Sequence, residues 1–220
     1  SLFTLFNFYS LQRPTGLEKF LADYDFEIGF NQVSDSKNEQ SGQGGLLLVD
    51  NLGSHPITKP ILDSRLHLLL PRSVDIPEAE NDESPPGSIL AHSSDAGQSV
   101  GQIQGNKGSI EREGKIPLIA AKLHANDGQP SARLVVAGDS LFLGNSAIEA
   151  GANRDFASLA VNWLLEREHL LAIAPRTVTE YRIELSRAEM TSVTWLLLLV
   201  LPGGTLGLGL LWWRRQMKRS

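Results

Sequence analysis

A serine that follows an aspartate at the end of an apolar segment is the clearest arrangement in this sequence that could carry out chemistry. The segment Leu134–Ala137 is uniformly apolar and is followed by Gly138-Asp139-Ser140-Leu141. A serine at a strand end can act as a nucleophile when a carboxylate orients a histidine that accepts its proton. By residue type, Glu166 and His169 could form such a pair.

Two interpretations of this segment remain open. Gly138-Asp139-Ser140-Leu141 matches the four-letter signature of the lipases and esterases named for it, and this resemblance implies a membrane-tethered esterase that uses Ser140. That family carries Asp-x-x-His much further along the chain, and its other glycine and asparagine blocks have no clear match here. A continued helix would also turn His169 far from the apolar stripe before it. We therefore favour a non-catalytic segment, in which Asp139 and Ser140 end the strand and satisfy turn amides.

Four other residues are candidate ligand or interaction positions. His55-Pro56-Ile57-Thr58 is typical of a turn between two elements, and a binding role is open for His55 and Thr58. Asn153 is expected to cap a helix, with Asp155 near the positive end of its dipole. Together with Asp139 and Ser140, these residues form the complete set of candidate positions.

The composition excludes several classes of protein. The chain has no cysteine, and its five histidines are widely scattered, so neither a metal site nor a cysteine nucleophile is predicted. No phosphate-binding loop of the Gly-x-x-x-x-Gly-Lys-Ser/Thr type occurs, and no cofactor is predicted. The formal net charge is −5 although the C-terminus is basic, and an acidic body argues against nucleic-acid binding.

The elements that must position these residues follow from hydrophobic patterning. Apolar residues at helical spacing predict a helix after Thr15 and another after Asn153, the second with a stripe from Phe156 to Leu164. Short apolar runs predict strands at 26–30, 46–49, 66–70, 116–123, 134–137 and 178–185. Strands interleaved with helices indicate an α/β layered domain with a mainly parallel sheet.

Three regions are expected along the chain. Residues 1–185 form the α/β domain, which includes an irregular, flexible insert at about 76–110 that is rich in Pro, Gly, Ser and acidic residues. Residues 186–214 form a helix that enters and crosses a membrane, opened by the capping box Ser186-Arg187-Ala188-Glu189. Residues 215–220 form a basic cytoplasmic tail.

The membrane span is predicted from an uncharged run. Val193–Trp213 contains no charged residue and is roughly 31 Å long as a helix, which matches the hydrocarbon core of a bilayer. Tryptophans lie near both ends, and Arg214 and Arg215 follow at once. By the positive-inside rule, the C-terminus is expected in the cytoplasm and the larger part of the chain outside.

The order of several segments resembles a known family. After the apolar strand come His55-Pro56-Ile57-Thr58, then 114–118 and Arg133–Ser140, then 151–155 and 161–164, then Leu-Ala-Ile-Ala-Pro-Arg at 171–176 and the terminal helix. From about residue 15 to the end, this order is similar to the C-terminal part of the auxiliary component of an ABC transporter associated with gliding motility.

The resemblance implies a fold, partners and a location. It implies an extracytoplasmic domain of the amidotransferase-like or flavodoxin-like α/β type without a catalytic cysteine, anchored in the lipid bilayer of the bacterial inner membrane. It also implies a separate ABC ATPase and permease as partners. The family's usual Gly-Asn-Arg-Asp is Gly151-Ala152-Asn153-Arg154-Asp155 here, with one inserted alanine, and Leu141 stands at a position that is usually acidic.

Overall fold

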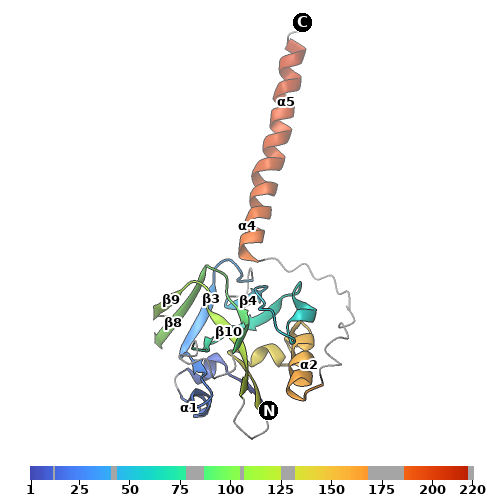
Figure 1. Cartoon of the computed structure of the whole chain (residues 1–220). Helices are drawn as coiled ribbons and strands as arrows, with labels where there is room; N and C mark the ends of the chain where they lie inside the picture. Colours follow the sequence, from blue (N-terminus) through green and yellow to red (C-terminus); the bar gives the residue numbers. More distant parts are fainter. Residues whose placement is uncertain are drawn as a thin grey trace.

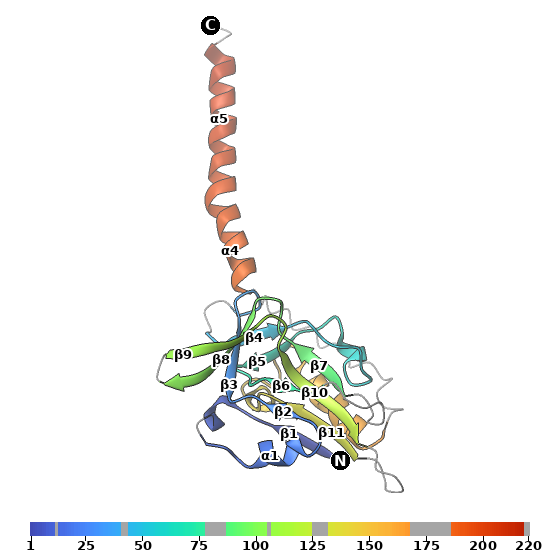
Figure 2. The ribbon, with the colours of Figure 1, turned by 60° about the vertical axis from the view of Figure 1, so that its left-hand side comes forward.

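The computed structural model describes residues 1–11, 13–40, 44–77, 87–104, 107–124, 132–167 and 186–217. In these ranges, short strands make up most of one domain, and a long helix projects from it (Figures 1 and 2). The strands are β1 (Leu2–Leu5), β2 (Glu27–Ile28), β3 (Asn31–Asp35), β4 (Leu46–Val49), β5 (Leu66–Leu69), β6 (Val74–Asp75), β7 (Ser88–His92), β8 (Gly97–Gln104), β9 (Lys107–Glu113), β10 (Pro117–His124) and β11 (Ala132–Ala137). The helices are η1 (Phe8–Ser10), α1 (Leu17–Ala22), η2 (Lys59–Ile61), η3 (Leu141–Leu143), α2 (Asn153–Leu164), α4 (Arg187–Trp195), η4 (Leu196–Val200) and α5 (Leu201–Met217).

These strands form four small sheets. The largest has the order β1-β11-β10-β7, and the others are β3-β8-β9, β2-β6 and β4-β5. Only the pairing of β1 with β11 is parallel among the strand pairs of the described ranges. The prediction of an amidotransferase-like or flavodoxin-like domain with a mainly parallel sheet is therefore wrong. The fold is mixed, with mostly antiparallel sheets and few helices.

The apolar run Leu134–Ala137 explains this error. All four residues are buried, as predicted, but β11 runs antiparallel to β10. Val135 and Ala137 join the larger core, whereas Leu134 and Val136 join a second core on the opposite face of the strand. A continuous apolar run reports burial on both faces and carries no information about the direction of the neighbouring strand.

Helix α2 covers the larger core, and here the prediction is confirmed. Its predicted stripe is buried, namely Phe156, Leu159, Ala160, Trp163 and Leu164. Trp163 is 6% exposed, and the guanidinium carbon of Arg133 lies 5.0 Å from its ring centroid. Arg133 Nη1 also donates to the Trp163 carbonyl at 2.8 Å, which ties the end of α2 to the start of β11. The strand expected at 178–185 lies outside the described residues.

The insert expected at 76–110 is largely regular where the structure describes it. Residues 88–92, 97–104 and 107–110 belong to β7, β8 and β9, so the expectation of irregular structure is wrong for them. Small and polar residues occupy buried strand positions here, among them Ser99, which is 1% exposed opposite Arg112 on β9. Because such residues lack hydrophobicity, the alternation of a strand was not visible in the sequence.

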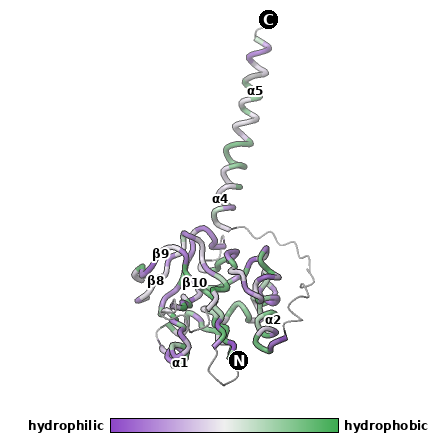
Figure 3. Tube along the Cα trace, viewed as in Figure 1, coloured by the Kyte–Doolittle hydropathy of each residue, from purple (hydrophilic) through white to green (hydrophobic). Residues whose placement is uncertain are grey.

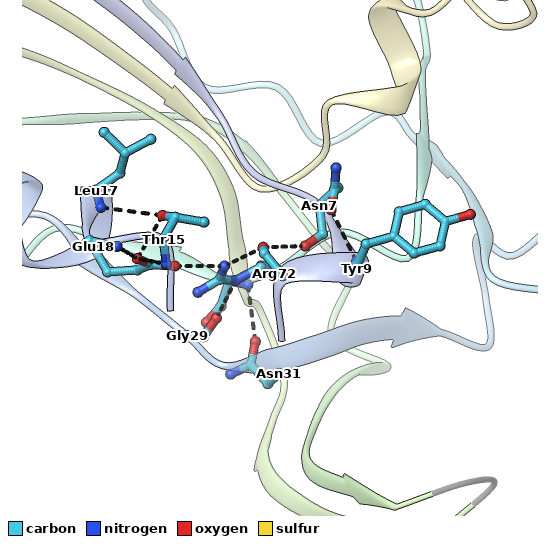
Figure 4. Close-up of polar contacts among 11 residues, drawn as sticks. Asn7, Tyr9, Thr15, Leu17, Glu18, Gly29, Asn31 and Arg72 are labelled. Carbon is cyan, nitrogen blue, oxygen red and sulfur yellow. Dashed lines mark hydrogen bonds and ion pairs between the residues drawn. The ribbon is translucent and has the colours of Figure 1, made fainter. Parts of the chain in front are cut away.

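A buried arginine joins the N-terminal segment to the rest of the domain (Figure 4). Arg72 is 0% exposed, and its Nη1 contacts Glu18 Oε1 at 3.0 Å and Ser10 Oγ at 2.9 Å, while Nε donates to the Gly29 carbonyl at 2.7 Å. The aromatic rings of Phe6 and Phe30 lie 4.8 and 4.7 Å from the guanidinium carbon. This cluster satisfies a charge that would otherwise be costly to bury.

The C-terminal helix lies apart from the domain. Ala188–Met217 is long and apolar enough to cross a membrane, and none of its apolar window is buried. It points away from the end of the domain opposite the N-terminus, and its middle is coloured as hydrophobic (Figure 3). The predicted capping box at its start is confirmed, because Ser186 N donates to Glu189 Oε2 and Glu189 N donates to Ser186 Oγ.

Candidate functional site

Asp139 forms the centre of the candidate site, directly after β11. Its carboxylate is 0% exposed and accepts hydrogen bonds from the backbone amides of Leu69 and Leu141, both at 2.8 Å. Burial raises the pKa of Asp139 to about 6, although these amides counteract the effect. The prediction that Asp139 satisfies turn amides is confirmed for Leu141, and the carboxylate additionally binds β5 through Leu69.

The residues on either side of Asp139 also have structural roles. Gly138 approaches the segment between β5 and β6 so closely that an added Cβ would lie 1.9 Å from the Arg72 carbonyl oxygen. Ser140 Oγ accepts a hydrogen bond from Asn7 Nδ2 at 3.0 Å, and a side-chain amide cannot take up a proton from the serine. His169, the histidine considered as its base, lies outside the described residues.

Asn153 is a buried brace and not the predicted N-cap. Ala152 occupies the cap position of α2, and Asn153 is its first residue. Its Oδ1 accepts from the His67 amide at 2.9 Å, and its Nδ2 lies 3.1 Å from the carbonyls of His67 and Phe142. The same Nδ2 lies 3.0 Å from the Ala147 carbonyl. One side chain thus fixes β5, η3 and the turn before α2 relative to one another.

These braced segments enclose a pocket of about 370 Å³, which we call the Asp139 pocket. Its polar side chains are Gln40, His67, Asp139 and Ser146. The remaining lining residues are apolar: Leu46, Leu69, Leu141, Phe142, Ala147 and Ala150. Asp139 is therefore the one predicted position that lines this pocket, and Asn153 supports it from behind by holding His67, Phe142 and Ala147.

His55 and Thr58 lie elsewhere, beside the end of α2. The His55 ring packs edge-on against Trp163 with centroids 5.1 Å apart, and its Nδ1 accepts from the Ile57 amide at 3.2 Å. Burial and the nearby charge of Arg133 lower the pKa of His55 to about 4. The Thr58 hydroxyl is buried and contacts the carbonyls of Gly53 and His55. Both side chains therefore stabilise a turn.

Asp155 lies in the first turn of α2, as predicted, but it does not line the Asp139 pocket. Burial raises its pKa, and the neighbouring Arg154 counteracts this.

His67 and Gln40 are the lining residues that sequence reasoning missed. His67 is 3% exposed within Leu66–Leu69, and a polar residue inside an apolar strand was the signal that could have identified it.

The rim of the Asp139 pocket reaches the start of the C-terminal helix. Gln40 lines the pocket, and its backbone forms an isolated antiparallel bridge with Ser186, the N-cap of α4. Nearby, Arg65 Nη2 lies 3.4 Å from Glu189 Oε1, and Arg65 directly precedes β5. The domain thus holds the first turn of the helix beside the pocket through two independent contacts.

The fold and the pocket define a β-rich domain joined to an apolar helix. No family model and no curated protein matches the sequence. A solved structure described as the mmIFT52 N-terminal domain is similar in fold, with a TM-score of 0.50 and 12% identity. The likeness covers 74% of this chain and 63% of that chain, so this chain spans less than two thirds of its length. At this identity the likeness concerns the fold alone, and it agrees with the mixed architecture described above.

Proposed function

We propose that this chain is a non-catalytic, membrane-anchored accessory component of an ABC transport system. The observation that carries the proposal is the helix Ala188–Met217, which is apolar, unburied and attached to a folded domain by a capping box. An apolar helix of this length is stable in a lipid bilayer and unfavourable in water. The order of sequence segments shared with auxiliary components of gliding-motility transporters supports the assignment to an ABC system.

The proposed orientation places the β-rich domain outside the bacterial cytoplasmic membrane and the C-terminus in the cytoplasm. Arg214 and Arg215 close the apolar run, and basic residues are retained on the cytoplasmic side. Trp212 and Trp213 precede them and are exposed, as suits side chains at the membrane interface. Partners in this arrangement are a separate ATPase inside the cell and a permease in the membrane.

Protease accessibility tests the orientation. Protease added to intact spheroplasts should digest the domain and spare a tag at the C-terminus. Replacing the basic residues after Trp213 with glutamine should yield a mixed orientation, whereas the same change at exposed Lys19 and Lys37 should have no effect. A C-terminal tag that is digested from outside in the unmodified chain would refute the orientation.

Association tests the assignment to a transport system. Extraction in a mild detergent should co-purify an ATPase and a multi-span permease in fixed stoichiometry with this chain. A chain that is recovered alone after cross-linking in intact membranes would contradict the accessory role. Stoichiometric labelling of Ser140 by a fluorophosphonate, lost in Ser140→Ala, would contradict the non-catalytic role.

A further inference from the structure

The Asp139 pocket has the composition of a ligand site as well as the volume of one. Its walls come from segments far apart in the sequence: the residue Gln40, the strands β4 and β5, and the segment 139–150. Six of its ten lining residues are apolar and four have polar side chains, a mixture that suits a small amphipathic molecule. The Asn153 brace holds several of these segments from behind, so the pocket is formed before any ligand arrives.

The charge of the pocket selects among ligand classes. Asp139 is the one carboxylate in the wall, and within the described residues it forms no ion pair, since its hydrogen bonds come from backbone amides. No lysine or arginine lines the pocket. A buried carboxylate without a cation is unfavourable, and a cationic ligand would supply the missing charge. An anionic ligand would meet a like charge and no free cationic donor in the wall.

From these observations we infer that the Asp139 pocket binds a small amphipathic cation, with an ammonium group directed at Asp139 and an apolar part against Leu69, Leu141 and Phe142. The carboxylate accepts the backbone amides of Leu69 and Leu141, and those of Ser140 and Phe142 also stabilise it. An ammonium group in the pocket would therefore be attracted by the negative charge of Asp139 without displacing these bonds. This inference stands independently of the proposed transport role, because it concerns only the domain.

Ligand-observed fluorine NMR on the full chain in dodecyl maltoside micelles tests the inference. The probe is 4-fluorophenethylamine, and 3-(4-fluorophenyl)propionate is its matched anion with the same ring and spacer. Empty micelles correct for partition into detergent. The signal of the amine should broaden in the presence of the chain, and the signal of the anion should not.

Two variants assign the binding to the pocket. Asp139→Asn should weaken binding of the amine at least tenfold, whereas Asp95→Asn, which removes an exposed carboxylate, should leave it unchanged. Ala147→Leu retains Asp139 but fills part of the pocket, and it should also weaken binding at least tenfold. Since Asp139→Asn could disturb folding, near-ultraviolet circular dichroism checks that both variants are folded. If Asp139→Asn is unfolded, the result for Ala147→Leu alone tests the inference. Equal binding of amine and anion, or an amine affinity unchanged in folded Ala147→Leu, would overturn the inference.

Discussion

Asp139 and His55, whose pKa values are shifted strongly by burial, should oppose each other in their effect on stability as the pH changes. Burial raises the pKa of Asp139 to about 6, so the folded state binds a proton more tightly than the unfolded state does. The stability gained from this proton is complete below about pH 4 and is lost as the pH rises through 6. His55 has a pKa lowered to about 4, so its contribution is complete above about pH 6.5 and is lost on acidification.

The size of each effect follows from the two pKa values. For Asp139, the change from the usual 3.8 to about 6 corresponds to about 3 kcal/mol over the whole range and to about 1 kcal/mol between pH 7 and pH 5. His55 gives an effect of the opposite sign, reduced below its full value because the ring is only half-buried. The two contributions therefore partly offset each other in the unmodified chain.

Single substitutions should reveal the two contributions separately. Urea unfolding of the full chain in detergent, followed by near-ultraviolet circular dichroism at pH 5, 6 and 7, gives the free energy of unfolding. From pH 5 to pH 7, the free energy of unfolding of the unmodified chain should fall by about 1 kcal/mol relative to that of Asp139→Asn. The corresponding difference for His55→Gln should change in the opposite direction. Only this pH dependence matters, because the loss of amide contacts by Asp139→Asn adds a constant offset of about 1–3 kcal/mol.

A pH-independent difference for Asp139→Asn would refute the reasoning. It would mean that the carboxylate titrates near its ordinary pKa, and hence that water reaches it in the folded chain. An Asp63→Asn variant serves as the control, because it removes an exposed carboxylate and leaves Asp139 in place.

Three further substitutions test the packing of the domain. Trp163→Ala should destabilise the domain by about 3–5 kcal/mol in urea unfolding. Val161→Ala, on the exposed face of α2, should cost less than about 1 kcal/mol. Equal effects of the two substitutions would contradict the orientation of the helix. Arg72→Met leaves the Glu18 carboxylate without its cation and should cost about 3–5 kcal/mol of stability. The double variant with Glu18→Gln should recover much of this loss. Purely additive effects in the double variant would argue against the pairing. Gly138→Ala should prevent soluble expression or cost several kcal/mol, because its Cβ would overlap the Arg72 carbonyl. A neutral result would show that the segment between β5 and β6 can move aside.

Hydrophobic pattern predicted the positions of elements well and their arrangement poorly. The stripe of α2, the strands at Leu46–Val49 and Leu66–Leu69, and the box at Ser186 and Glu189 were all predictable, because each is encoded within a few adjacent residues. The direction of β11 was not predictable, since burial on both faces occurs in parallel and antiparallel sheets alike. Strands β8 and β9 were missed because serine and glycine fill positions that larger apolar residues usually mark.

The candidate site shows the same division between local and distant contacts. The role of Asp139 at the end of β11 was predictable in part, because the amide of Leu141 is two residues away. Its bond to Leu69 and the pocket shared with His67 and Gln40 were not, since these residues come together only through the fold. The same holds for Asn153, whose type favours a helix cap but whose side chain reaches four other groups in the interior.

The fixed start of the C-terminal helix has a consequence for where the domain would stand if the helix spans a bilayer as proposed. Val193, the first residue of the uncharged run, lies seven positions after Ser186, which is about 10 Å of helix. The headgroup layer on one side of a bilayer is about 5–8 Å thick, so in the proposed membrane arrangement the contacts at Gln40 and Arg65 would hold the domain at the surface of the lipid. In that arrangement, too little of the helix would remain above the lipid to act as a stalk. Molecules that concentrate in the interfacial layer, where amphipathic cations gather, would therefore meet the domain by diffusing along the membrane plane.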